Sequence, residues 1–417
     1  MAVVVLTSSA WSAERKIVVW DWEPPEIVAK YQAAFNRWQQ ETGITIEFQQ
    51  VGWSEMRDKV TVAIAGGAPP DVVRVSSAWG SLVADQGMFL DLRPYLQQHN
   101  ATYRFDEFYP ASVDLWTDAM GRVYALGNDL DMMGFFFNAE LFDEAGVERP
   151  YEYTWDQWLD AARKLTRDLD GDGRPDQYGF TNWWFHYVTL IWANGGDIFT
   201  ADRSRSALAS PAAREALSFY RRFFELDTVA TFEISQAQGY PHSAAHFKAG
   251  KIAMAPAGAW MPNYYVWDDQ RRQYNFDFDV GHMPLSYAGG RATSLEGSGY
   301  AIPANAANKE DAFRFIAFVT SHEWQSEYVT TGFPSRRPVA EMAFSGPQVP
   351  ENRAVFLEIA TYAHPFPKGV EWQGRTGQLV LSNLNQYLTG QRGLEEVLTT
   401  IDEQLRPLLQ ELATSRR

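Results

Sequence analysis

The order of apolar segments at the start of the chain restricts the fold more than any other feature. Residues 16–20 are an apolar run typical of a buried strand, and residues 26–41 place apolar side chains at helical spacing. A strand pattern over residues 44–51, a helix pattern over 54–64 and a second buried strand over 71–75 follow. This β-α-β-α-β order predicts an α/β fold with mainly parallel sheets flanked by helices.

Polar residues follow the predicted strands. Ligands of open α/β sheets bind beyond the carboxyl ends of the strands. In this chain those ends are residues 21–23 and 74–77. A further polar elbow, residues 127–131, lies between two short strands predicted within residues 122–139.

Length and composition predict more than one domain. The chain has 417 residues, 46% of them hydrophobic, whereas single cores stop growing at about 250–300 residues. No low-complexity linker divides it, so we expect two lobes joined by several chain crossings. The absence of Cys excludes disulfides and cysteine nucleophiles. The net charge of −16 argues against nucleic acid or an anionic membrane as the main partner, because phosphate binding needs a surplus of Lys and Arg.

The first 13 residues look like a truncated signal segment. They contain a short apolar stretch and small residues but lack the basic beginning of a complete signal peptide. The alternative is a strand-like or disordered N-terminus of a cytoplasmic protein. No later segment offers about 18 uninterrupted apolar residues, so the folded body is predicted to be soluble.

Tryptophan is unusually abundant and unusually placed. The chain has 16 Trp. Core packing explains any single one equally well, but the set at strand ends and turns favours a cleft lined by indoles. A sugar stacks its C–H face on an indole while polar side chains bind its hydroxyl groups, so the set favours a saccharide site. The Trp residues placed in this way are Trp20, Trp22, Trp53, Trp79, Trp183, Trp184, Trp260 and Trp372.

An acidic loop follows the helix predicted from Thr154 onward. Gly173 and the Asp residues take the relative positions 1, 3, 5, 6 and 9 of a calcium-binding loop, but the twelfth position is Gly179 where a bidentate Glu is expected. The loop is therefore either a weakened calcium site or a hydrated Asp/Gly turn. Its candidate ligands are Asp168, Asp170, Asp172 and Asp176.

Motifs for bond chemistry are few. The chain lacks a dinucleotide fingerprint, a P-loop and a G-x-S-x-G elbow. Asp129 and Asp131 are the carboxylate pair that a glycoside hydrolase could use, and the alternative is a solvated turn.

Longer motifs run along most of the chain. They are PPDVV at 69–73, GMFLDLRPYL at 87–96, GRVYALGNDLDMMGFFFNAELFDEAGV at 121–147, the stretch 154–180, NGGDIF at 194–199, FKAGKIAMAPAGAW at 247–260, GSGYAIPANAANKEDAFRFIAFVTS at 297–321 and GFPSRRPV at 332–339. In order and spacing they resemble the extracellular solute-binding proteins of ABC importers, specifically the family 1 group that carries mostly sugars.

The resemblance implies two lobes that close on a ligand. Lobe 1 would comprise residues 14–127 and 285–331, and lobe 2 residues 128–284 and 332–417. The missing Cys of a lipid anchor and the short leader depart from the family pattern, which leaves the mode of anchoring open. The ligand contacts that the resemblance implies are Asp21, Trp22, Glu23, Arg74, Ser76, Trp79, Asn128, Asp129, Asp131, Trp183, Trp184, Trp260, Glu296 and Arg336.

Together these observations predict a monomeric periplasmic or cell-surface protein that captures a carbohydrate. Because candidate Trp platforms are many, we expect an oligosaccharide, delivered without bond chemistry to the membrane permease of an ABC importer. No cofactor is required, apart from the calcium that the acidic loop could hold. The alternatives are a polyol or a glycerol-phosphate ester, whose phosphate would suit Arg74 or Arg336, and a glycoside hydrolase or lyase.

Overall fold

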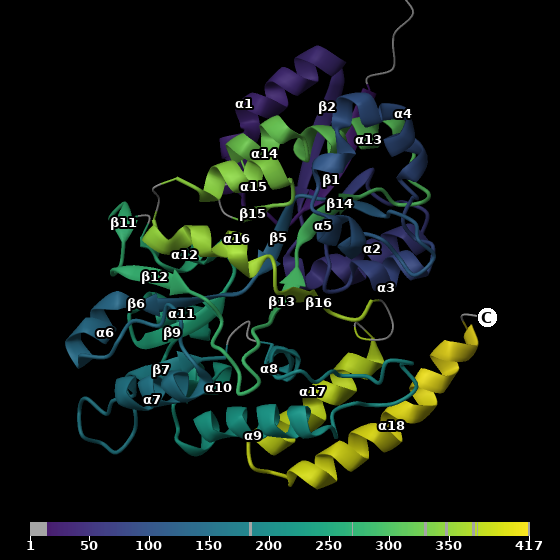
Figure 1. Cartoon of the computed structure of the whole chain (residues 1–417). Helices are drawn as coiled ribbons and strands as arrows, with labels where there is room; N and C mark the ends of the chain where they lie inside the picture. The colour runs from purple at the N-terminus through teal and green to yellow at the C-terminus, as the bar shows by residue number, and fades with distance from the viewer. Residues whose placement is uncertain are drawn as a thin grey trace, which may run out of the picture.

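The structure is a computed structural model that describes residues 15–182, 186–268, 270–328, 332–346, 349–368, 372 and 374–415. These residues form two bodies of helices and strands with a small sheet between them (Figure 1). We call the body that contains the N-terminal elements the first lobe and the other body the second lobe. The predicted two-lobed α/β fold is confirmed. The predicted signal-like segment lies outside the described residues.

The first lobe is built on a five-stranded sheet. Within the predicted β-α-β-α-β unit, the first strand lies between the other two and is parallel to both. A strand from late in the chain enters the same sheet in the antiparallel direction. The strands, in spatial order, are Ile44–Gln50 (β2), Arg15–Asp21 (β1), Val72–Ser76 (β3), Ser298–Ala301 (β14) and Ala125–Gly127 (β4).

Helices cover both faces of this sheet because successive side chains of a strand point to opposite sides. Val72 of β3 packs with Phe35 and Phe315 on one face, whereas Val73 packs with Met56 on the other. The helices of this lobe are Pro25–Thr42 (α1), Trp53–Ala65 (α2), Gly80–Asp85 (α3), Arg93–Tyr103 (α4), Pro110–Leu115 (α5), Lys309–Val319 (α13) and His322–Tyr328 (α14), with the 3-10 turn Phe105–Glu107 (η1). The helix Arg337–Phe344 (α15) contacts α14 and also packs Phe344 into a core of the second lobe.

The second lobe has a five-stranded sheet of its own. Phe135 and Phe137 of its second strand face one core and Phe136 faces the other, as the alternation of strand side chains requires. The strands, in spatial order, are Phe278–Gly281 (β12), Gly134–Asn138 (β6), Ile252–Ala257 (β9), Tyr178–Thr181 (β7) and Val229–Ala230 (β8), and Trp267–Asp268 (β10) forms a separate hairpin with Gln273–Tyr274 (β11).

Most remaining helices surround that sheet. The two longest, Pro211–Glu225 (α9) and Leu394–Ser415 (α18), lie along the outer side of the lobe (Figure 1). The remaining helices are Ala139–Ala145 (α6), Trp155–Leu165 (α7), Val188–Ala193 (α8), Pro211–Glu225 (α9), Phe232–Ala237 (α10), Ser243–Lys248 (α11), Met261–Tyr265 (α12), Glu351–Ala354 (η2), Val355–Ile359 (α16), Arg375–Leu388 (α17) and Leu394–Ser415 (α18). Within the described part of the chain, no helix has the length and apolar content to cross a bilayer.

Both sheets are mixed rather than mainly parallel. In the first, β1 is parallel to β2 and β3, and in the second, β7 is parallel to β8 and β9, but the remaining pairs in each sheet are antiparallel. The local α/β alternation predicts the parallel strands correctly. The antiparallel strands include segments that return from the opposite lobe, and local periodicity contains no information about their direction.

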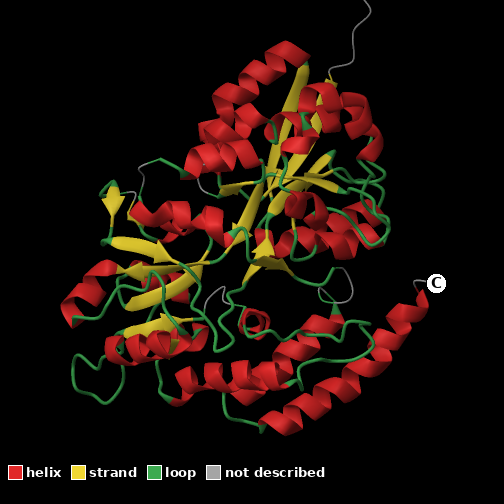
Figure 2. Cartoon of the chain, in the orientation of Figure 1, coloured by secondary structure: helices red, strands yellow, loops and turns green. Residues whose placement is uncertain are grey.

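A four-stranded sheet links the lobes (Figure 2). The expectation of a polar elbow over residues 127–131 is corrected here, because residues 129–131 belong to a strand of this sheet. The pairing partners of this strand lie far away in sequence, so no local pattern reveals it. In spatial order the strands are Phe333–Pro334 (β15), Asp129–Met132 (β5), Thr293–Glu296 (β13) and Ala363–Pro365 (β16).

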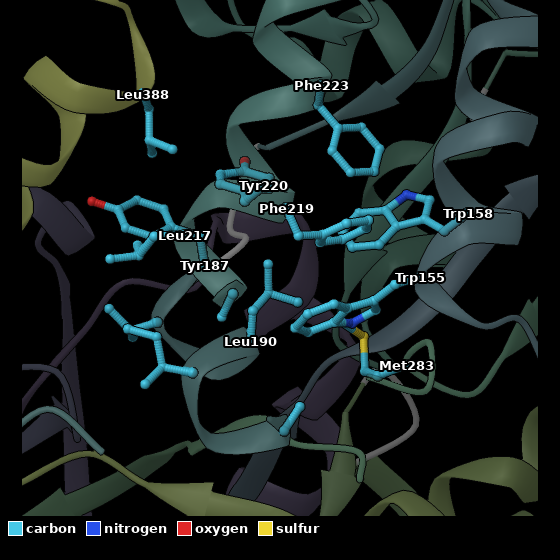
Figure 3. Packing of buried hydrophobic residues seen from close by; sticks show 14 of the residues in the cluster. Trp155, Trp158, Tyr187, Leu190, Leu217, Phe219, Tyr220, Phe223, Met283 and Leu388 are labelled. Carbon is cyan, nitrogen blue, oxygen red and sulfur yellow. The ribbon is translucent and has the colours of Figure 1, made fainter. Parts of the chain in front are cut away.

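The second lobe contains a large aromatic core (Figure 3). Helix α7 begins with a capping box, since Thr154 Oγ1 accepts from the Gln157 amide and Gln157 Oε1 accepts from the Thr154 amide. Trp155 stacks on Phe219 of α9, with ring centroids 4.5 Å apart. The helix predicted from Thr154 onward is therefore confirmed, and its packing fixes the position where the acidic loop begins.

Close packing explains the glycine at the twelfth loop position. Gly179 lies in β7, and a Cβ there would come within 2.0 Å of the Ala162 carbonyl oxygen of α7. A Glu at this position would push the helix off the strand. The loop therefore departs from the calcium pattern because its last residue belongs to the packed interface between α7 and β7.

Gly179→Ala should destabilise the fold by about 3 kcal/mol, at the upper end of the range for overpacked cores. The matched control is Gly393→Ala, where a Cβ meets no atom within 4 Å. Chemical denaturation of the two variants measures the difference. Equal stability of both variants would show that α7 and β7 are packed less closely than described.

Candidate functional site

The largest concentration of predicted site residues surrounds a cavity of about 340 Å³ between the lobes. One wall comes from the segment after β1, the start of α2 and the end of β3, and another from the turn that holds α12. Between these walls, strands β5 and β13 of the linking sheet supply Asp129, Asp131 and Glu296. The residues around the cavity are Trp22, Glu23, Pro24, Trp53, Arg74, Ser76, Asp129, Asp131, Met133, Trp260, Tyr265, Glu296, Gly297, Ser298 and Gly332.

A buried guanidinium organises the polar side of this cavity. Arg74 Nη1 donates to Glu23 Oε1 at 2.5 Å and to Asp21 Oδ1 at 3.2 Å. Arg74 Nη2 donates to Asp129 Oδ2 at 3.5 Å and to Ser298 Oγ at 3.0 Å. Burial opposes the charge of Arg74, yet the surrounding carboxylates, led by Asp21, raise its pKa well above the usual value. Arg74 therefore stays charged and holds three carboxylates in place.

The neighbouring groups complete the cluster. The guanidinium carbon of Arg74 lies 4.6 Å from the ring centroid of Trp22, a cation–π contact. Tyr300 donates its hydroxyl to Asp21 Oδ2 at 2.8 Å. Asp129 Oδ1 accepts from the Ser298 amide at 2.7 Å. Each of these contacts joins segments that are distant in sequence, so the cluster ties β1, β3, β5 and β14 together.

Asp131 is the carboxylate in a different environment. It stands opposite Glu296 in the antiparallel register of β5 and β13. Burial raises its pKa well above the ordinary value, and the charges of Asp129 and Glu296 raise it further. Arg74 and a hydrogen bond with the Trp260 side chain oppose this rise only in part. Asp131 therefore retains its proton more readily than an exposed carboxyl group.

A second cavity of about 190 Å³ begins on the other side of Glu296. His186 Nε2 lies 3.2 Å from Glu296 Oε1; burial disfavours the imidazolium, but Glu296 outweighs this and raises the pKa of His186. Phe366 and Trp372 stack with an interplanar angle of 6° and line this cavity. Glu296 lines both cavities, so the two adjoin at this side chain.

The acidic loop lies apart from the cleft, between α7 and β7. Asp168, Asp170 and Asp176 each offer an oxygen atom, and these three atoms lie within 4.8 Å of one another. Backbone amides of Gly171 and Gly173 donate to Asp168 and lower its pKa. Hard oxygen ligands at this spacing fit a cation such as calcium. Asp172 is outside the cluster, and its Oδ1 accepts from the Arg174 amide.

Comparison with known families now assigns the chain to a family. The sequence pattern of a family described as bacterial extracellular solute-binding protein matches residues 22–326. The chain belongs to this solute-binding protein family. The resemblance stated from sequence motifs is confirmed.

Individual relatives are distant. A binding protein of Brucella abortus (strain 2308) is 24% identical over 359 residues, which are 82% of this chain and 81% of that protein. An arabinooligosaccharide-binding protein of Bacillus subtilis (strain 168) is 21% identical over 324 residues, covering 76% and 71% of the two chains. An ABC substrate-binding protein from Listeria monocytogenes, solved in complex with cycloalternan, superposes with a TM-score of 0.81 at 20% identity, covering 95% of this chain and 99% of that one.

In this solute-binding protein the cavity brings together many of the residues expected to contact the ligand. Asp21 and Asn128 lie directly behind the cavity wall, where Asp21 binds Arg74 and Asn128 donates to Asp129. Trp183 and Trp184 lie outside the described residues. The expected residues that do line the cavity are Trp22, Glu23, Arg74, Ser76, Asp129, Asp131, Trp260 and Glu296.

Two expected residues lie elsewhere. Trp79 is 5% exposed and packs in the core of the first lobe. Arg336 is buried between the rings of Tyr103 and Phe108 and donates to Glu107 and to three backbone carbonyls. Its guanidinium thus fastens the segment after β15 to the first lobe, and the motif around it gave no indication of this burial.

Other lining residues were not among the ligand contacts expected from the family resemblance, although Trp53 belongs to the tryptophans expected to line a cleft. Trp53 and Tyr265 face the cavity, and Ser298 binds both Arg74 and Asp129. The position of Trp53 directly after β2 was a usable signal, because Trp22 follows β1 in the same way. Nothing local distinguishes Tyr265, since it reaches the cavity only through the position of α12.

Arg74→Met should destabilise the protein by about 3–5 kcal/mol, because three buried carboxylates lose the cation between them. The control is Arg93→Met, which removes a solvent-exposed partner of Asp91 and should change the melting temperature little. Chemical denaturation near neutral pH measures both. Equal effects of the two substitutions would show that the Arg74 cluster carries no special stability.

Proposed function

We propose that this protein captures a carbohydrate, and specifically an oligosaccharide, in the cleft between its lobes and delivers it to an ABC importer. The observation that carries the proposal is a cavity with aromatic walls and a polar floor. Trp22, Trp53 and Trp260 offer rings on which sugar C–H faces can stack, while carboxylates can accept hydrogen bonds from hydroxyl groups. The relatives named for arabinooligosaccharide and cycloalternan support the same class of ligand.

The two adjoining cavities support an oligosaccharide. The second cavity adjoins the first at Glu296 and offers a stacked aromatic pair, Phe366 and Trp372. A single sugar ring fills only one of the two cavities. A chain of rings can contact both.

Ligand binding acts through the two lobes. The aromatic walls come from different lobes, so a ligand that contacts both stabilises the closed arrangement. The permease then recognises this arrangement. Lobe boundaries at residues 127/128 and 284/285 are supported by β4 and β14 lying in the first sheet and β6 and β12 in the second. The hydrogen bonds of Arg336 to the carbonyls of Tyr103, Arg104 and Thr320 favour a third crossing after residue 336 rather than at 331/332.

A phosphate ester fits the cleft less well. The donors of Arg74 are already directed at Asp21, Glu23, Asp129 and Ser298. Arg336 is 1% exposed and lies in the first lobe. Neither guanidinium is placed to receive a phosphate, which favours a neutral or cationic solute over a glycerol-phosphate ester.

Bond chemistry is also disfavoured. A glycoside hydrolase needs two carboxylates on opposite sides of the scissile bond. Asp129 and Asp131 lie two positions apart on the same strand, β5, and Asp129 already binds Ser298, Asn128 and Arg74. We therefore assign these carboxylates to binding rather than to acid–base catalysis.

The setting follows from the family, whose members are extracellular. We assign the protein to the periplasm or the cell surface, as a monomer whose partners are its carbohydrate and the permease subunits. The net charge of −16 fits this absence of nucleic acid among the partners. No cofactor is needed for binding by shape and hydrogen bonds. Calcium at the acidic loop would serve as a staple between α7 and β7.

Calorimetry with a panel of oligosaccharides tests the function. Trp260→Ala should weaken the binding of any active sugar by roughly 1–3 kcal/mol through lost stacking, and leave the melting temperature nearly unchanged. Trp267→Ala is the control, because Trp267 lies in the β10–β11 hairpin and lines neither cavity.

Two results would contradict the proposal. The first is a complete lack of binding across the panel, with polyols bound instead. The second is release of shorter sugars during incubation with the purified protein, which chromatography would detect.

The acidic loop gives a separate prediction. Asp170→Ala should abolish any rise in melting temperature that calcium causes, because binding to the native state alone raises stability. Asp172→Ala should keep that rise, since Asp172 lies outside the cluster. Identical melting curves of the unaltered protein with calcium and with chelator would leave the loop as a hydrated turn.

A further inference from the structure

The charges around the main cavity do not balance. Among the residues that line it, Glu23, Asp129, Asp131 and Glu296 are acidic, whereas Arg74 is the single Lys or Arg. Asp21 adds a further carboxylate directly behind the wall. Burying uncompensated charge is costly, so the cavity as described favours a positive partner or a bound proton.

Arg74 cannot supply the missing charge. It lies within 3.5 Å of three carboxylates, Asp21, Glu23 and Asp129. One guanidinium is therefore already shared by more negative groups than it can neutralise. Asp131 and Glu296 gain little from it.

Asp131 and Glu296 are the carboxylates of this cavity that form no ion pair with Arg74. They stand opposite each other on neighbouring strands, and both line the cavity. In the described part of the chain, no Lys, Arg or His makes an ion pair with Asp131, and the partner of Glu296 is His186 in the second cavity. Two carboxylates at adjoining positions of one wall fit an ammonium group, which has several donors and a single positive charge.

The aromatic walls fit the same group. Indole faces attract cations as well as sugar C–H groups. The site already contains one such contact, between Arg74 and Trp22. Trp260 bridges the two features, because its side chain lines the cavity and hydrogen-bonds to Asp131.

We propose that the ligand is a saccharide that carries a basic amino group, and that its ammonium binds at Asp131 and Glu296. This inference rests on the proposed function and narrows its substrate class. A neutral sugar would leave the excess negative charge in place or require a proton on one carboxylate. An amino sugar removes the excess directly.

The protonation of Asp131 gives an independent signature. Burial beside Asp129 and Glu296 raises the pKa of Asp131, so this carboxyl group binds a proton more readily in the free protein than an exposed one does. An ammonium that binds beside Asp131 stabilises the carboxylate and releases that proton to the buffer. The enthalpy measured by calorimetry should then depend on the ionisation enthalpy of the buffer, whereas a neutral sugar should release no proton.

Matched disaccharides and trisaccharides test the proposal. Three β-1,4-linked series differ at carbon 2 of each ring: glucosamine oligomers carry an amine, glucose oligomers a hydroxyl group and N-acetylglucosamine oligomers a neutral amide. At a pH near 6 the amine is charged, and the glucosamine oligomers should bind at least about tenfold more tightly than either neutral series. Proton release should accompany only the amine series.

Asp131→Asn separates charge from shape. The amide has nearly the same size, so the ratio of amine to neutral affinity should fall to about parity and proton release should disappear. Asp143→Asn, on the solvent-exposed partner of Arg149, is the control and should retain the preference.

The outcomes are distinguishable. Neutral sugars that bind as tightly as the amine, or an amine preference that survives Asp131→Asn, would overturn this inference and leave the proposed function standing. Binding of no member of any series, together with no binding across the wider oligosaccharide panel, would overturn both.

Discussion

The ion cluster around Arg74 is the interaction on which the rest of the site depends. One buried guanidinium contacts Asp21 and Glu23 at the end of β1 and Asp129 on the linking sheet. Buried carboxylates repel one another unless a cation lies between them, so removal of Arg74 would push the ends of these strands apart. The cluster is expensive to desolvate, and an apolar core of similar volume could be at least as stable. Its value lies in fixing the floor of a cavity at the meeting point of two lobes.

The floor and the walls of the cleft have different mechanical roles. Asp129 is held by Ser298 and Asn128 as well as by Arg74, so the floor is rigid. Trp22 and Trp260 stand on different lobes and can move relative to each other when the lobes bend at the linking sheet. A ligand with differential affinity for the closed state can therefore shift the lobes without disturbing the groups that hold its polar side.

The predictability of this protein from sequence follows the range of the contacts. Local periodicity reveals β1 to β3, the capped helix α7 and the strand-end positions of Trp22 and Arg74. It does not reveal β5, whose partners β13 and β15 lie far along the chain. The site shows the same division. The motif around Arg336 suggested a ligand contact, yet the environment of this side chain, formed by Tyr103, Phe108 and backbone carbonyls, depends on how distant segments meet. Ser298 has an inconspicuous sequence context and nonetheless binds two members of the ion cluster.

The position of β14 has a consequence for how the chain is made. This strand lies between β3 and β4, although residues 298–301 follow them by more than a hundred positions. Until residue 301 leaves the ribosome, β3 presents an unpaired edge composed of buried residues, and such edges promote association with other chains. The first lobe cannot complete its sheet before most of the second lobe has been synthesised. The edge of β3 therefore stays open to pairing with other chains while the protein is made, and in a fragment that ends before residue 298 it never closes.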